Sequence, residues 1–223
     1  MAPIIHTVNL RKVYAVGKER VIALNDVSIS IEKGEFCCIV GQSGSGKSTL
    51  LNQLAGLEKP TRGKVFIGSH EISAMTEDEL AKFRQAHLGF IFQSYNLLPT
   101  MTAAENVALP LMFKGISRSQ RLAMARALLH DTPIYLFDEA TSNVDAESEN
   151  DIMAAIHSLA GKKTVILISH RLANVVDSDC IYVLDKGCIV EQGKHADLLA
   201  AQGAYSRLYT AQKQLETLGK EDA

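Results

Sequence analysis

A glycine-rich stretch, GQSGSGKST at residues 41–49, fits the phosphate-binding loop pattern G-x-x-x-x-G-K-[ST]. Its glycines let the backbone curl so that successive N–H groups point at a phosphate, and the helix expected to follow adds a positive dipole end. We expect Lys47 to bridge the β- and γ-phosphates and Ser48 to bind Mg²⁺. The residues predicted to contact the nucleotide are Gly41, Ser43, Gly44, Ser45, Gly46, Lys47, Ser48 and Thr49.

A second stretch, IYLFDE at residues 134–139, ends in two carboxylates. The apolar run predicts a strand that delivers Asp138 to a metal, which a carboxylate binds directly or through water. Glu139 follows at a position where a base could orient an attacking water. Two carboxylates at a strand end are common by themselves. Combined with the phosphate loop, they predict a site for ATP and Mg²⁺.

Several short elements are expected to position these residues. The runs FCCIV, IYLF and TVILI are continuously apolar, which predicts central strands of a parallel sheet that is covered on both faces. The segment 144–160 between the last two predicts a helix of a βαβ unit. Thr76 and Glu79 have capping-box spacing and predict a helix over 76–86. Further expected elements are strands near 4–10, 21–31 and 64–67, a strand at 88–92, helices near 102–113 and 118–130, a hairpin around DKG at 185–187, and a helical tail over 196–220.

Composition narrows the class of protein. The chain has 223 residues, 47% hydrophobic and 22% charged, with a net charge of -2 and no basic surplus that would indicate nucleic acid. Its apolar runs are far shorter than the roughly 20 residues that cross a bilayer, and its start lacks a signal-peptide pattern. We therefore expect a cytoplasmic chain without direct membrane insertion. Cys37, Cys38, Cys180 and Cys188 lack zinc-site spacing and are predicted to be buried free thiols.

Together these motifs resemble the nucleotide-binding domain of ATP-binding cassette (ABC) transporters over nearly the whole chain. The resemblance implies an α/β fold in one domain, 1–223, with a P-loop NTPase (RecA-like) core, a mainly parallel sheet and an N-terminal antiparallel β-subdomain. It implies that Tyr14 stacks on adenine and that Gln93, in FIFQSYNLLP, senses Mg²⁺ and couples to the permease. It also implies that His170 contacts the γ-phosphate and that residues 142–145 face a partner subunit.

The two halves resemble different branches of that family. VGQSGSGKSTLLNQLAGLEKPTRG and FIFQSYNLLPTMTAAENVALPL are similar to the lipoprotein-release and macrolide-export subfamily. FDEATSNVDAESE, ISHRLANV and GKHADLLAAQGAYSRLY are similar to exporters whose ATPase is fused to the membrane domain. A recombined or engineered chain explains this difference best, and a natural mosaic is the alternative.

The signature LSGGQ, by which the family is defined, is absent. ISRSQ stands at residues 116–120, ahead of the predicted helix RLAMARALL. This segment is either a degenerate signature or a seam near 116–122, where a deletion joins the chain at Arg121. Only 45 positions separate Gln93 from Asp138, which leaves room for two ordinary helices and not for the α-helical subdomain of the family. The spacing favours a deletion in which that subdomain is largely missing.

Three functions compete on this basis. The first is an ATPase subunit that energises transport, working with a membrane permease subunit and a second ATPase subunit through Asp138, Glu139 and His170. It would lie peripherally on the inner face of the membrane. The second is a nucleotide-binding module with little hydrolysis and no coupling to transport. The third is a scaffold with a vestigial phosphate loop.

Overall fold

The computed structural model describes residues 3–92, 100, 132–141 and 146–221, with the side chains of 146–148 and 216–221 left out. Several predictions fall outside this part of the chain. They are the seam at 116–122, the helices near 102–113 and 118–130, the Mg²⁺-sensing role of Gln93 and the partner-facing segment 142–145.

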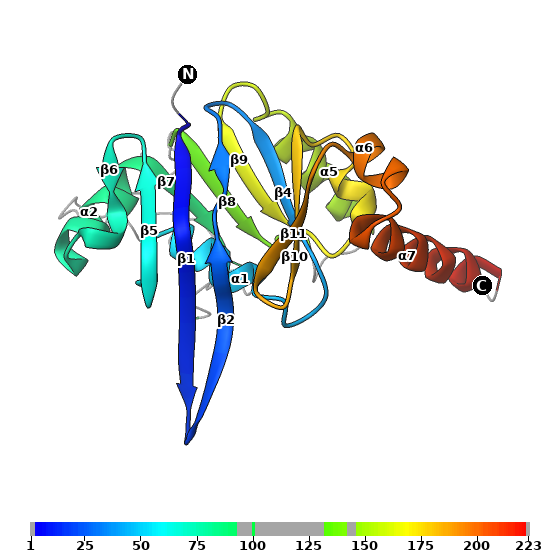
Figure 1. Cartoon of the computed structure of the whole chain (residues 1–223). Coiled ribbons are helices and arrows are strands. Elements are labelled where there is room, and N and C mark those ends of the chain that lie inside the picture. The colour runs from blue at the N-terminus through cyan, green and yellow to red at the C-terminus, as the bar shows by residue number, and fades with distance from the viewer. Residues whose placement is uncertain (1–2, 93–99, 101–131, 142–145, 222–223) are drawn as a thin grey trace.

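The larger sheet has six strands in the order β11-β10-β4-β9-β8-β7, of which all but the hairpin strand β11 run parallel (Figure 1). Every residue of the central strands β4 and β9 is buried, as their continuous apolar sequences predict. The mainly parallel sheet is thereby confirmed. Its strands are β4 (Phe36–Val40), β7 (Leu88–Ile91), β8 (Ile134–Asp138), β9 (Thr164–Ile168), β10 (Cys180–Asp185) and β11 (Cys188–Gly193).

The N-terminal sheet is antiparallel, as expected. Its order is β2-β1-β5-β6, with the short β3 also paired to β1. Strand β1 is bulged against both of its long neighbours, because its register shifts between Leu10 and Val13 on one side and between Val8 and Arg11 on the other. The strands are β1 (Ile5–Val16), β2 (Glu19–Val27), β3 (Ser30–Ile31), β5 (Arg62–Ile67) and β6 (His70–Glu71).

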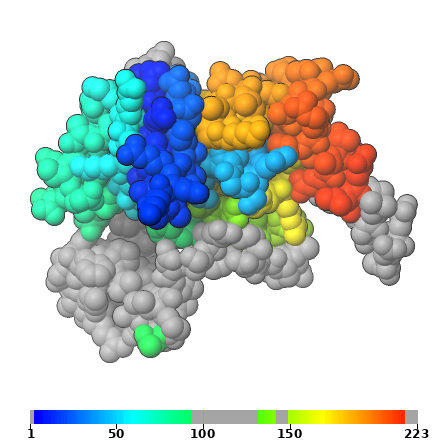
Figure 2. Space-filling view, turned by 60° about the horizontal axis from the view of Figure 1, so that its bottom comes forward, coloured from blue at the N-terminus to red at the C-terminus, as the bar shows by residue number. Residues whose placement is uncertain are grey.

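Helices cover both faces of the parallel sheet. Leu50, Leu51 and Leu54 of α1 belong to a core shared with the N-terminal sheet and one face of β4 and β9. Met153 of α5 and Tyr205 of α7 pack on the opposite face. Helices α2 and α6 also bury side chains in these two cores, and they lie at opposite ends of the molecule (Figure 2). The helices are α1 (Lys47–Leu54), α2 (Glu77–His87), α5 (Ala146–His157), α6 (His195–Ala200) and α7 (Ala204–Glu221), with 3-10 turns η1 (Ile72–Ala74) and η2 (Leu172–Val175).

Two predictions for the helices can be compared with the structure, the capping box at residue 76 and the helical tail. The capping box at α2 is present, with Thr76 accepting from the Glu79 N–H and the Glu79 side chain accepting from the Thr76 N–H. The helical tail predicted over 196–220 is present as two helices, α6 and α7, because the chain turns at residues 201–203. There Gln202 has a φ of 54°, and the carboxylate of Glu191 accepts hydrogen bonds from Ala204 N (2.5 Å) and Tyr205 N (2.9 Å) at the start of α7.

The four cysteines are free thiols. Cys37 and Cys38 are buried as predicted, whereas Cys180 and Cys188 are only partly buried. Among the described residues, no helix combines the length and the apolar character that a membrane crossing requires.

Candidate functional site

The phosphate loop lies at the carboxyl edge of the parallel sheet, between β4 and α1. Gly44 and Gly46 have φ angles of 76° and 104°, in the left-handed region that favours glycine. A Cβ at Gly41 would overlap the carbonyl oxygen of Leu184, and one at Gly46 would overlap that of Ala23. Strands β10 and β2 thus approach the loop backbone so closely that glycine is required at both contacts.

Lys47 is the first residue of α1 and is 5% exposed. Its Nζ donates to the carbonyl oxygens of Gly41 (3.0 Å) and Gln42 (2.9 Å), so the loop itself holds the ammonium group. Burial lowers the pKa of Lys47, and the nearby Glu139 and Asp138 act in the opposite direction. Among the described residues, the hydrogen-bond acceptors of this ammonium group are backbone carbonyl oxygens, and a buried cation held in this way is suited to receive an anion.

Ser45 supplies a second indication that the loop can take a phosphate. Its Oγ is buried and has no hydrogen-bond partner among the described residues. Buried hydroxyl groups without a partner are uncommon and call for an explanation. A phosphate oxygen cradled by the loop would accept this hydrogen bond, so the loop fits the group that its sequence pattern implies.

Ser48 and Asp138 join the two predicted motifs, which are 90 residues apart. Ser48 Oγ donates to Asp138 Oδ1 at 3.1 Å. Burial raises the pKa of Asp138, the hydrogen bond from Ser48 lowers it, and Glu139 raises it further. The result is a desolvated carboxylate beside a hydroxyl, two hard oxygen donors of the kind that Mg²⁺ prefers.

Few described side chains are placed to bind a metal ion. No group of three or more His, Cys, Asp or Glu side chains is placed to hold a metal among the residues that the structure describes. Mg²⁺ commonly binds through one or two carboxylates together with substrate phosphates and water. Ser48 and Asp138 beside a phosphate loop therefore fit Mg²⁺ bound together with a nucleotide.

Glu139 and His170 follow the adjacent strands β8 and β9, and the structure brings them together. His170 Nε2 lies 2.5 Å from Glu139 Oε1. Glu139 adopts a φ of 50°, unusual for a residue with a side chain, and its N–H donates to Ile168 O at 3.1 Å. The structure thus places two of the predicted catalytic residues, Glu139 and His170, close to Asp138 and Lys47.

Tyr14, predicted to stack on adenine, lies on β1. Its hydroxyl donates to Glu58 Oε2 at 2.7 Å, and Lys12 Nζ lies 5.1 Å from the ring centroid and 3.1 Å from the same carboxylate. Burial raises the pKa of Tyr14, and Glu58 raises it further while Thr49 lowers it. The hydroxyl of Tyr14 therefore lies near the first turn of α1, and the stacking of its ring on adenine stays a prediction.

The segment that follows His170 is held by hydrogen bonds to Glu149 and Gln212, two residues that the sequence analysis did not identify. Glu149, 3% exposed on α5, accepts from Arg171 Nη1 and from Asn174 Nδ2 (3.0 Å). Leu172 N donates to Gln212 Oε1 of α7 at 2.9 Å. No local pattern marks Glu149 or Gln212, because each reads as an ordinary polar residue on a helix. Glu58, the partner of Tyr14, was missed for the same reason.

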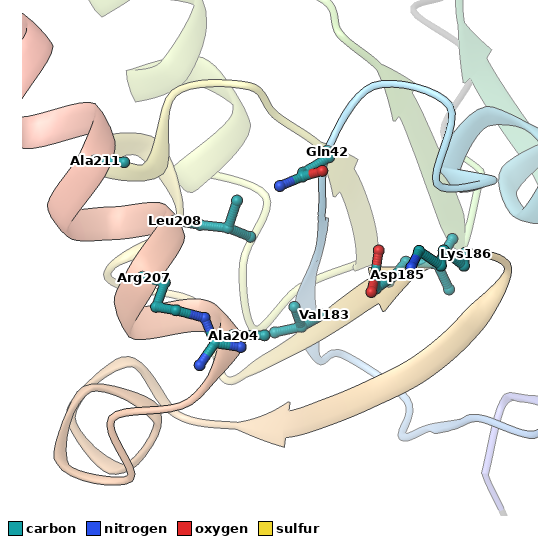
Figure 3. A pocket seen from close by; sticks show the side chains of 9 residues that line it. Gln42, Val183, Asp185, Lys186, Ala204, Arg207, Leu208 and Ala211 are labelled. Atoms are coloured by element: carbon teal, nitrogen blue, oxygen red, sulfur yellow. The ribbon is translucent and has the colours of Figure 1, made fainter.

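A groove of about 470 Å³ flanks the outer side of the phosphate loop (Figure 3). One wall is the face of α7 that carries Arg207 and Leu208, and the other is the end of β10 with Gln42 above it. Because Gln42 O also accepts from Lys47 Nζ, the groove adjoins the loop through one residue. None of the described residues that line it belongs to the predicted nucleotide site.

Comparison with known proteins places these features in a family. The profile described as ABC transporter matches residues 24–121. An uncharacterized ABC transporter ATP-binding protein of Thermotoga maritima is 36% identical over 221 residues, covering 85% of this chain and 94% of the relative. Another from Haemophilus influenzae is 36% identical over 228 residues, covering 88% of this chain but 40% of the relative. The chain therefore spans less than half of that second protein.

A solved structure is similar to this chain as well. The dimeric structure of the ATP-binding cassette MJ0796, in a post-hydrolysis state bound to ADP and Pi, superposes with a TM-score of 0.77 at 34% identity. It covers 85% of this chain and 98% of the other. MJ0796 is an uncharacterized ABC transporter ATP-binding protein of Methanocaldococcus jannaschii.

The alignments include positions that this chain lacks. The Haemophilus alignment runs over 228 positions, although 88% of 223 residues is about 196 residues, so about 32 positions have no counterpart here. The profile match ends at residue 121, before Asp138 and Glu139.

Proposed function

This chain belongs to the ABC transporter family of ATP-binding proteins, and from that premise we propose that it binds Mg·ATP in cis. The observation that carries the proposal is the 3.1 Å hydrogen bond between Ser48 and Asp138. It joins a phosphate loop to a carboxylate that suits a metal, at the edge of the sheet where α/β proteins bind their ligands. The solved relative bound to ADP and Pi supports the same ligand class.

Each residue has a specific task in this proposal. The loop N–H groups and the Ser45 hydroxyl hold phosphate oxygens, while Lys47 leaves the loop carbonyls for the β- and γ-phosphates. Ser48 and Asp138 hold Mg²⁺, which would neutralise phosphate charge when bound. The Tyr14 ring stacks on adenine, with its hydroxyl anchored by Glu58.

By family, the chain would be an ATPase subunit that energises membrane transport. Glu139 would orient the attacking water and His170 would contact the γ-phosphate, and their 2.5 Å contact supports roles at one reacting centre. Relatives named macrolide export ATP-binding/permease protein support a membrane permease as partner, and the dimeric cassette structures support a second ATPase subunit. Such partners would place the chain peripherally on the inner face of the membrane.

We favour a second form of the proposal, a nucleotide-binding module with little hydrolysis and no coupling to transport. The roughly 32 unmatched positions, the profile match that ends at residue 121 and the sequence ISRSQ at 116–120 all support a deletion near 116–122. In the family the LSGGQ segment reaches across to the ATP of the second subunit. Loss of one donor aimed at developing charge costs about 10²–10³-fold in rate.

The test of cis binding compares two lysine variants. Lys47→Ala should lower the affinity for Mg·ATP at least about tenfold in a calorimetric titration, because it removes a charged donor to phosphate. Lys162→Ala is the matched control, since Lys162 is exposed before β9, at the opposite end of that strand from His170. An equal effect of both substitutions, or no measurable affinity in the parent chain, would refute the proposal.

A further inference from the structure

Two arginines face each other on the outer side of the N-terminal sheet. Arg11 of β1 and Arg62 of β5 are directly paired in the antiparallel register, on strands that lie side by side in Figure 1. Side chains paired in this way point to the same face, and like charges placed directly opposite each other are destabilising. The pair therefore has an energetic cost that the fold alone does not explain.

Neighbouring cations in the same sheet form ion pairs, and these two arginines form none with the described residues. Lys64, two residues from Arg62, forms an ion pair with Glu71 at 3.0 Å. Lys12, adjacent to Arg11, forms one with Glu58 at 3.1 Å. Within the described part of the chain, neither the Arg11 nor the Arg62 guanidinium donates a hydrogen bond or forms an ion pair.

The two arginines line a cavity of about 510 Å³ together with Asn9, Asn25 and Asp26. The bulge in β1 forms it, because the register shifts between Val8 and Arg11 where Asn9 has a φ of 47°. Among the described residues that line the cavity, Asp26 is the one with a carboxylate, and it accepts from Asn9 Nδ2 at 2.5 Å. Its charge offsets one of the two guanidinium groups and leaves the cavity with a net positive charge.

The wall opposite the bulge is also fixed. Gly63, next to Arg62, has a φ of 91°, and a Cβ there would overlap the carbonyl oxygens of Val8 and Asn9. Asn9 N also donates to Ser28 Oγ at 2.9 Å. The backbone on both sides of the arginine pair is therefore held in place before any ligand arrives, which lowers the entropic cost of binding one.

We propose that this cavity is an anion site that takes a phosphate group. Guanidinium groups bind phosphate in a bidentate manner, and two facing guanidinium groups can hold one such group between them. The asparagine side chains supply neutral donors beside it. The site is separate from the nucleotide site, because Leu10 and Val65 of the same strands pack into the core shared with α1, whereas Arg11 and Arg62 line the outer face.

The experiment uses inorganic pyrophosphate as the probe, titrated calorimetrically into the Lys47→Ala chain so that the phosphate loop contributes little. We expect binding to persist, and the double variant Arg11→Gln/Arg62→Gln to weaken it at least about tenfold. Lys64→Gln removes a neighbouring cation that is already paired, and it should change the affinity less than about twofold. Equal binding by the double variant, or no binding by the Lys47→Ala chain, overturns the proposal.

A second variant separates binding from folding. Arg62→Glu places opposite charges at the same register, so the ligand-free chain should melt at a higher temperature while pyrophosphate binding is lost. A lower melting temperature together with retained binding contradicts the proposal. Flotation with phosphatidylcholine vesicles, with and without phosphatidic acid, then identifies the source of the phosphate. Arginine-dependent capture by phosphatidic acid indicates a lipid headgroup, and pyrophosphate binding without capture indicates a free phosphate compound.

Discussion

The Oε1 atom of Glu139 and the Nε2 atom of His170 lie 2.5 Å apart, each just beyond the end of one of two adjacent parallel strands. The backbone produces this contact, because Asp138 and Ile168 are paired in register and Glu139 N donates to Ile168 O at 3.1 Å. Glu139 is held at a φ of 50°, and residues in such sparsely populated conformations are concentrated at functional sites. The contact thus links the proposed base to the residue that would contact the γ-phosphate.

His170→Ala should weaken the binding of ATP much more than the binding of ADP. If the imidazole contacts the γ-phosphate, its loss lowers ATP affinity about tenfold and leaves ADP affinity within about twofold, because ADP lacks that group. Titrations of both nucleotides with Mg²⁺ measure this difference. His70→Ala serves as the control, since His70 is an exposed histidine on β6. Equal losses for the two nucleotides would indicate a general structural defect.

The Glu149 carboxylate makes Arg171 important for stability. Glu149 is 3% exposed, so Arg171→Ala leaves a buried carboxylate with less compensation. Because the Arg171 side chain is half exposed, we expect a cost of about 1–2 kcal/mol and a melting temperature lower by roughly 2–8 °C. Adding Glu149→Gln should recover part of this loss, since the charge disappears and an amide oxygen still accepts from Asn174. Additive losses in the double variant would contradict the prediction.

The lowered pKa of Glu58 predicts that the stability of the fold depends on pH. Burial raises its pKa, but the hydrogen bond from Tyr14, the hydrogen bond and charge of Lys12, and the Asn52 amide lower it more, so that the net pKa falls below 4.5. A carboxyl group whose pKa is lower in the folded state stabilises the fold above its unfolded pKa and loses that effect as pH falls through the folded value.

The corresponding measurement is thermal unfolding of the parent chain and Glu58→Gln between pH 7 and pH 3. The parent should be more stable near neutral pH by up to about 1 kcal/mol, the range for partly exposed pairs. The difference should shrink below about pH 4.5. A difference that stays constant across this range would show that the ionisation of Glu58 is unimportant.

Features encoded in contiguous residues were predictable from the sequence. The phosphate loop, the capping box at Thr76 and the buried strands β4, β8 and β9 each depend on a local pattern of residue types. The antiparallel N-terminal sheet followed from the family resemblance, and so did the expectation that His170 acts in ATP hydrolysis together with Glu139. The roles of these site residues remain predictions.

Features that depend on distant partners were not predictable. The break between α6 and α7 requires Glu191 of β11 to accept hydrogen bonds from Ala204 and Tyr205, and no local pattern announces it. Glu58 meets Tyr14 across 44 positions, and Arg11 meets Arg62 across a register that the bulge in β1 sets. Such contacts arise from the packing of the sheets and helices, which residue types alone do not specify.

We propose that the chain binds Mg·ATP in cis and lacks the part of the family fold that acts across a dimer. The most direct measurement adds Mg·ATP to the Glu139→Gln chain and records its mass in solution, with nucleotide binding and phosphate release by the parent chain measured in parallel. We predict one ATP bound per chain, a monomer with or without ATP, and phosphate release that is about 10²–10³-fold below that of an ABC cassette with an intact signature. A stable ATP-bound dimer of Glu139→Gln, with robust Glu139-dependent hydrolysis by the parent, would contradict the account.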